Sequence, residues 1–249
     1  MLRGNTSVSH YSPGNVFVWM TMAFQAGALN IGGFLACHAF VSHATGNVSM
    51  LFGVRPWESS FADTLPVMLA PAFFLLGAML SGILVDRAIR QNRKPKYYVT
   101  FSWMFAILLV ILAAGRSGAL GTFGEPLNRG RDFFLLVLLS LVCGIQNGTL
   151  TTVSRSVIRT THLTGLLTDL GIGVVRALSG PHGDRAHEMR ANWMRLGIIA
   201  FFACGCAAAG LAFRRWDFLG FALPLSTCGL LLAIMLYYQI IKPAWAHPR

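Results

Sequence analysis

The chain has 249 residues, of which 55% are hydrophobic and only 12% are charged, and its formal net charge is +11. A soluble domain is less apolar, because polar residues must cover its surface. The composition therefore excludes an ordinary soluble globular domain and predicts a protein that spans a membrane. The positive charge by itself would suit nucleic acid, but the basic residues fall between apolar stretches, so we expect no nucleic-acid partner.

Six apolar stretches follow one another along the chain, and each lacks Asp, Glu, Lys and Arg for 18 residues or more. A helix of that length crosses the hydrocarbon of a bilayer. We therefore expect an all-α, polytopic membrane protein in which residues 1–249 form a single membrane domain. The expected transmembrane helices cover about 15–37, 62–85, 97–115, 132–153, 195–213 and 218–241, with a linker at 116–131 and a polar loop at 179–195.

A short polar motif occurs in each half of the chain. The first motif is Ser42-His43-Ala44-Thr45-Gly46-Asn47, and the second motif is Thr161-His162-Leu163-Thr164-Gly165. In both halves a glutamine inside an apolar stretch, Gln25 or Gln146, precedes the histidine by 18 or 16 residues. We therefore predict two related units, repeat 1 at about 15–115 and repeat 2 at about 132–241.

The two units are predicted to have opposite orientations in the membrane. Each contains an odd number of crossings, so the second unit enters the bilayer in the opposite sense to the first, as in many carriers. Basic residues favour the cytoplasmic side of a membrane. With a cytoplasmic N-terminus, the inside loops hold fourteen of the 20 lysines and arginines, and the outside loops hold six. The charge distribution thus predicts that both termini are cytoplasmic.

The second motif begins a segment with an amphipathic helical pattern. Polar and small residues recur along one face of it, at His162, Gly165, Asp169, Gly173 and Arg176. Such a segment can lie on the membrane surface as an interfacial helix, or fold back into the bundle as a re-entrant segment. The uncharged residues around the first motif favour the re-entrant alternative.

Other residues indicate how the helices pack. Small residues lie one helical turn apart, as at Gly77 and Ser81 or at Cys206 and Gly210, and they predict close contacts between helices. Tryptophans near the ends of the expected helices, Trp19 among them, are predicted to anchor at the membrane interface.

Amide side chains are expected inside two of the transmembrane helices, at Gln25, Asn30, Gln146 and Asn147. An amide in hydrocarbon needs a hydrogen-bond partner, so these side chains should face the interior of the bundle. There they either hold neighbouring helices together or line a polar site. The sequence leaves both alternatives open.

Titratable candidates are few, because the expected helices contain no carboxylate in their middle. They are His43, His162 and Asp169, which could form a proton relay or act as capping residues. The full candidate substrate-binding set is Gln25, Asn30, His43, Thr45, Gly46, Asn47, Gln146, Asn147, His162, Thr164, Gly165 and Asp169. Contacts to an anion or to lipid phosphates are predicted for Arg155, Arg159 and Arg176.

Motifs of known enzymes are missing from the sequence. It has no nucleophile elbow, phosphate-binding loop, dinucleotide fingerprint or zinc-binding helix. The five cysteines lie in apolar stretches without disulfide or zinc spacing. We therefore expect no enzyme, no catalytic residue, no metal site and no cofactor.

Two segments resemble the signatures of a known family. Residues 34–47, which end in the first motif, and Gly144-Ile145-Gln146-Asn147-Gly148 together with residues 159–171 are similar to the YoaK-like family of bacterial membrane proteins. The resemblance extends over nearly the whole chain. It implies a six-span protein of the bacterial cell inner membrane with a domain of unknown function, and it implies no substrate.

These observations favour a small-solute carrier with a polar site between the two motifs. The alternative is a non-transporting membrane scaffold or partner subunit, in which the motifs are packing turns. The expected partners are the lipid bilayer and an unknown small solute, and a second copy of the chain is a further candidate partner. A carrier needs an accessible internal cavity, whereas a scaffold would have Gln25 and Gln146 bonded to neighbouring helices.

Overall fold

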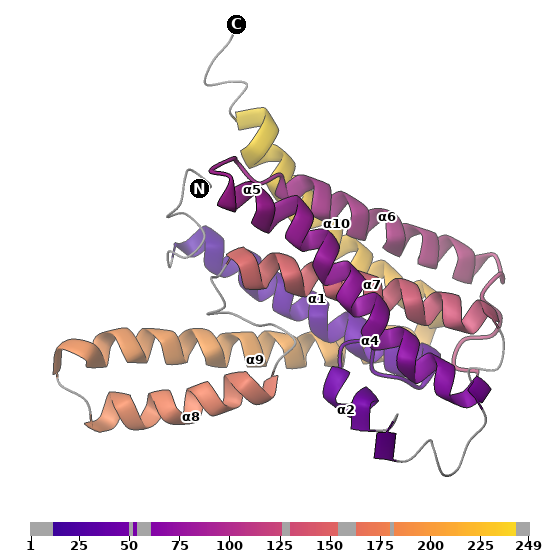
Figure 1. Ribbon diagram of the computed structural model, residues 1–249, viewed down its shortest axis with the longest axis horizontal. Helices are drawn as coiled ribbons and strands as arrows, with labels where there is room; N and C mark the ends of the chain where they lie inside the picture. Colours follow the sequence, from indigo (N-terminus) through magenta and orange to yellow (C-terminus); the bar gives the residue numbers. More distant parts are fainter. Residues whose placement is uncertain are drawn as a thin grey trace, which may run out of the picture.

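A computed structural model describes residues 12–49, 52–53, 61–125, 130–153, 163–179 and 182–242. These residues form helices and turns, and they contain no strand. The helices, shown in Figure 1, are α1 (Pro13–Cys37), α2 (Ala44–Ser49), α4 (Phe61–Ser81), the π-helix η3 (Gly82–Asp86), α5 (Arg87–Arg90), α6 (Tyr97–Arg116), α7 (Gly130–Val153), α8 (Leu163–Ser179), α9 (His182–Trp216), the 3-10 helix η4 (Asp217–Phe221), α10 (Ala222–Leu236) and the π-helix η5 (Tyr237–Ile241).

Five helical segments among the described residues are long and apolar enough to cross a membrane. They are Pro13–Cys37, Met68–Arg90, Tyr97–Arg116, Phe133–Thr152 and Arg185–Ile241. The last of these is 57 residues long and contains both α9 and α10. The prediction of an all-α, multi-pass membrane protein is confirmed, whereas the count of six crossings and the inverted repeat stay predictions.

The bounds of α1 follow from its capping residues. The Ser12 side chain accepts a hydrogen bond from the backbone N–H of Asn15 (3.3 Å), and Pro13 occupies the first turn, where no backbone N–H is needed. At the other end His38 has a left-handed conformation (φ 50°), and its N–H bonds to the Phe34 carbonyl. The helix therefore ends at Cys37, as the sequence predicts.

The pair formed by α1 and α9 is held by backbone contact at two glycines. A Cβ atom added to Gly27 would collide with the Phe202 carbonyl, and one added to Gly205 would collide with the Phe24 carbonyl. Further along, Gly32 lies against the Phe213 ring. Residue numbers increase together along the two helices, so α1 and α9 run parallel.

The pair formed by α4 and α7 has the same construction. Gly77 lies against the Leu141 carbonyl, and Gly144 lies against the Phe74 carbonyl. The two helices again run parallel, since Ser81 of α4 meets Thr149 of α7 further along (Oγ–Oγ1 2.9 Å). The predicted packing through Gly77 and Ser81 is confirmed.

The third long pair, α6 and α10, runs antiparallel. The Tyr98 N–H bonds to Gln239 Oε1 (3.1 Å) at the start of α6, whereas Gly115 at its end lies against Phe218. Beyond that end, four aromatic rings pack in stacked or T-shaped pairs: Phe123, Phe213, Phe218 and Phe221. This cluster closes one end of the bundle, and the Gln239 contacts close the other.

Two sequence expectations are wrong. The segment expected to be a polar loop at 179–195 is helical from His182, so α9 is longer than expected. The first part of α9 packs along α8, and the two helices project from the bundle as a pair (Figure 1). Trp19 is not an interface anchor, because it is only 2% exposed in the core. Trp103, Trp193 and Trp216 are exposed, as interface residues should be.

Candidate polar site between the helices

Gln25 lies in the centre of the bundle. It is fully buried on α1, and neither its Oε1 nor its Nε2 has a hydrogen-bond partner among the described residues. Its amide lies beside the Cys228 thiol of α10, which itself bonds to the Phe101 carbonyl of α6 (3.7 Å). Helices α1, α6 and α10 thus meet around an amide that has a thiol, a weak hydrogen-bonding group, as its polar neighbour in the part of the chain that the structure describes.

Gln146 of α7 lies against the same part of α1. Its Nε2 donates a hydrogen bond to the Met22 carbonyl (2.7 Å), and its Oε1 has no partner among the described residues. Because Met22 and Gln25 are three residues apart, they share one face of α1. Gln146 therefore contacts α1 about one turn before Gln25, and three of the four amide atoms of the two glutamines have no hydrogen-bond partner among the described residues.

Helix α7 carries other buried polar groups besides Gln146. Asn147 is 6% exposed and has an interaction of its own. The Thr149 hydroxyl bonds to the Ile145 carbonyl (2.8 Å) and to Ser81, which joins α7 to α4. Ser140 is fully buried, and its hydroxyl has no partner among the described residues. Sequence reasoning did not assign Ser140 or Thr149 to the site, since hydroxyls in apolar helices are common and carry little signal.

Asn30 serves a local role. Its Oδ1 accepts a hydrogen bond from Ser42 Oγ (2.9 Å), and it is half-buried. This bond ties the last turns of α1 to the residues that precede α2. Asn30 is thus an amide that holds two segments together.

The first motif forms a compact turn at the C-terminal end of α1. The His43 ring is exposed and lies edge-on to Phe40 (centroids 6.1 Å apart), and its carbonyl accepts from the Asn47 N–H (3.0 Å). The Asn47 side chain bonds to the Phe40 carbonyl (3.4 Å). Thr45 is exposed, and Gly46 lies against the His43 ring. The motif therefore starts α2, which packs against α4.

The second motif is described only in part. His162 lies outside the described residues, as do Arg155 and Arg159. Thr164, Gly165 and Asp169 are exposed on α8. The structure therefore places these three residues on the exposed surface of α8.

Helix α8 runs antiparallel to α9. Gly173 lies against Asn192, and Arg176 Nη1 is 3.8 Å from Glu188 Oε1. The same Glu188 lies 3.8 Å from Arg195. Because α8 is antiparallel, its first turn, which carries Thr164 and Gly165, is directed toward the middle of α9. The predicted amphipathic helix is present. Of the small and charged residues on its predicted polar face, Gly173 packs against α9, whereas Gly165 and Asp169 are exposed.

Comparison with known proteins gives the chain a family. The family described as "Protein of unknown function (DUF1275)" matches residues 18–237. The chain belongs to the DUF1275 family. This membership is consistent with the resemblance to YoaK-like membrane proteins, and it assigns no substrate. No curated protein and no solved structure matches the chain.

The described part of this DUF1275 protein contains no cluster of three or more His, Cys, Asp or Glu side chains that could hold a metal ion. All five cysteines are free. The candidate site is therefore a small group of buried amides and hydroxyls with no charged residue, at the level where α1 and α7 meet. Such a group can bind polar atoms of a ligand by hydrogen bonds.

Proposed function

We propose that this membrane protein is a carrier for a small polar solute, with its binding site at Gln25 and Gln146. The observation that carries the proposal is a pair of buried glutamines, three of whose four amide atoms have no hydrogen-bond partner among the described residues. A buried polar group without a partner costs about 1–3 kcal/mol. A ligand that hydrogen-bonds to these atoms would remove that cost, which is how a site inside an apolar bundle gains affinity and selectivity.

The proposal includes six crossings arranged as two inverted units of three helices. In such a chain the first and fifth crossings run parallel, the second and fourth run parallel, and the third and sixth run antiparallel. The pairs α1 with α9, α4 with α7, and α6 with α10 have these relations. The matching glycine contacts in the two parallel pairs support the same arrangement.

The two motifs are proposed to control entry to the site. The first motif follows the end of α1 that lies near Phe213 of α9, and the contacts of α8 lie along the earlier half of α9. The proposal is that the two motifs approach the site from opposite ends of the bundle, as alternating access through inverted repeats requires. With the predicted orientation in a bacterial inner membrane, His43 would face the outside and Asp169 the cytoplasm.

A scaffold is the second candidate, and one observation favours it. Gln146 bonds to the Met22 carbonyl and Asn30 bonds to Ser42, which are interactions that hold helices and turns together. A scaffold, however, gives no use to the Gln25 amide, which has no hydrogen-bond partner among the described residues. The two candidates thus differ in what they expect of this one side chain.

A ligand screen with matched variants tests the proposal. Purified protein in detergent is heated with a panel of metabolites and ions, and hits are assayed for flux in proteoliposomes. The variants are Gln25→Leu and, as the control, Gln239→Leu, which changes a glutamine at the far end of the bundle. We expect Gln25→Leu to abolish the thermal shift of a hit and Gln239→Leu to retain it. Two results would contradict the carrier. One is a hit that raises the unfolding temperature of Gln25→Leu as much as that of the unmodified protein, and the other is the absence of flux for every hit.

A further inference from the structure

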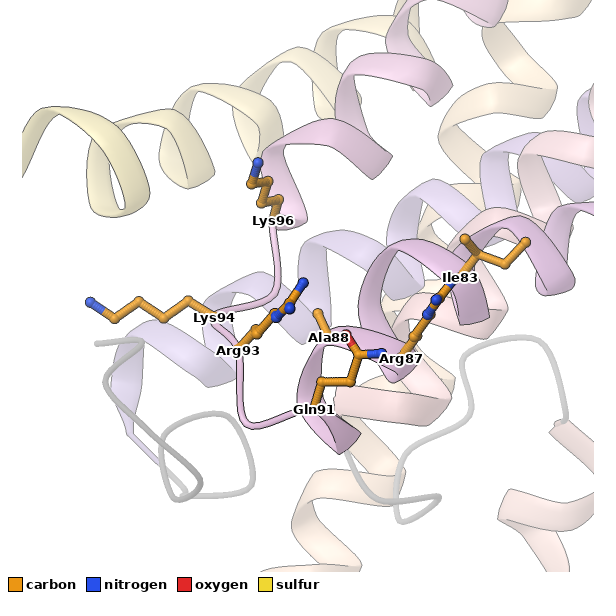
Figure 2. A pocket seen from close by; sticks show the side chains of 7 residues that line it. All are labelled: Ile83, Arg87, Ala88, Gln91, Arg93, Lys94 and Lys96. Atoms are coloured by element: carbon orange, nitrogen blue, oxygen red, sulfur yellow. The ribbon is translucent and has the colours of Figure 1, made fainter.

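A basic depression of about 420 Å³ lies where α5 turns into α6 (Figure 2). It is lined by Ile83, Arg87, Ala88, Gln91, Arg93, Lys94 and Lys96. Four of these residues are cationic and none is acidic. In Figure 2 Arg87, Gln91 and Arg93 surround Ala88, whereas the Lys94 side chain extends away from the others.

The charge of this depression is not neutralised by the nearby carboxylate. Asp86 forms an ion pair with Arg90 one turn later (Nε–Oδ2 2.7 Å), and Arg90 does not line the depression. Four cations around one depression repel each other unless an anion lies between them. The arrangement therefore favours a bound anion.

The backbone around the depression is held in place from two sides. Gln239 of η5 donates to the Pro95 carbonyl (2.8 Å) and accepts from the Tyr98 N–H (3.1 Å). Within the turn the Arg93 N–H bonds to the Ala88 carbonyl (2.8 Å), and Asn92 has a left-handed conformation (φ 54°). A fixed turn keeps the basic side chains near one another without a further loss of backbone entropy on binding.

An apolar stripe leads from the lipid-facing side of α4 to the depression. Leu76, Met79 and Ile83 are 48%, 54% and 59% exposed, and they lie on one helical face. Arg87 follows Ile83 by one turn on the same face. A molecule bound here would contact apolar side chains on the α4 side of the depression and cations on the α5 side.

We propose that this depression binds the phosphate of an anionic phospholipid, with the acyl chain along the α4 stripe. Guanidinium groups bind phosphate oxygens in pairs of charge-assisted hydrogen bonds, and basic pockets between transmembrane helices bind lipid headgroups. The site is independent of the polar site at Gln25 and Gln146.

Lipid titration followed by non-denaturing mass spectrometry tests the site. The detergent-purified protein is titrated with phosphatidylglycerol, with phosphatidylcholine of the same chains, and with glycerol phosphate. We expect phosphatidylglycerol to bind at least about tenfold more tightly than the other two, because only it has both the net negative charge and the acyl chain. Arg87→Gln combined with Arg93→Gln should remove this preference.

The matched control is Arg214→Gln combined with Arg215→Gln, which removes the same charge from exposed positions at the end of α9. It should leave the affinity for phosphatidylglycerol within about twofold, since it lies outside the depression. Ile83→Gln should weaken phosphatidylglycerol but not glycerol phosphate. Equal losses in the two double variants, no preference over phosphatidylcholine, or displacement of lipid by an equal concentration of glycerol phosphate would each overturn the proposal.

Discussion

The pair α1 and α9 and the pair α4 and α7 are alike in packing and unlike in polar contacts. In both pairs two glycines bring the helix backbones into contact, and in both the helices run parallel. Yet the glutamine of α7 bonds to α1, whereas the glutamine of α1 has no partner among the described residues. The two halves thus share the glycine contacts between parallel helices, and they differ in the hydrogen bonds of their glutamines.

That difference separates structural roles from functional ones. A contact that occurs in both halves is explained by helix packing, which both halves need. A glutamine that donates a hydrogen bond in one half and has no hydrogen-bond partner among the described residues in the other requires another explanation, because leaving a buried amide unpaired costs stability. Substitutions in the two halves can therefore show which residues stabilise the bundle and which serve a ligand.

The largest effects are expected at the glycine contacts. Gly205→Ala and Gly77→Ala should each lower the free energy of unfolding by about 2 kcal/mol or more, because the new Cβ would collide with a backbone carbonyl. Thermal unfolding in detergent measures the loss. The controls Gly210→Ala and Gly82→Ala have no described atom within 4 Å of the new Cβ and should not destabilise. A loss in only one half would show that the two pairs are not equivalent.

A smaller loss is expected at Gln146. Gln146→Leu removes the hydrogen bond to the Met22 carbonyl and should destabilise the protein by about 1 kcal/mol. The measurement is the same unfolding transition. An unchanged midpoint would mean that this bond does not hold α7 to α1.

Thr149→Val removes the contact with the Ser81 hydroxyl while it keeps the shape of the side chain. We expect a loss of about 0.6 kcal/mol, the average for a hydrogen bond between transmembrane helices. Ser81→Ala provides a second measure of the same bond, and the double variant should cost less than the sum of the single ones. Strict additivity would contradict the bond.

The smallest effect, and the opposite sign, is expected at Gln25. Gln25→Leu should leave stability unchanged or raise it by up to about 1 kcal/mol, because it replaces an unpaired buried amide by an apolar group of similar size. Comparison with Gln146→Leu under the same conditions gives the contrast between the halves. A loss equal to that of Gln146→Leu would assign Gln25 to helix packing.

Much of the fold follows from the sequence, and part of the site does not. The apolar length and capping residues predict α1, and the amphipathic pattern predicts α8. The polar composition of 182–195 predicts a loop, whereas the structure starts α9 there. The ion pairs of Glu188 that accompany this helix depend on tertiary packing, which the sequence pattern does not show. The importance of Gln25 and Gln146 could be predicted from their positions, but which of them would find a partner depends on the Met22 carbonyl, which no sequence pattern reveals.

The most direct test of the carrier is the water accessibility of position 25. In a variant whose five native cysteines are replaced, Gln25→Cys is exposed to a membrane-impermeant thiol reagent in proteoliposomes. Ala23→Cys is the control, since Ala23 is equally buried and shares the packed face of Gly27. The account predicts labelling at position 25 and none at position 23, because a carrier must open its polar site to water. Protection of both positions until the protein is denatured would contradict it.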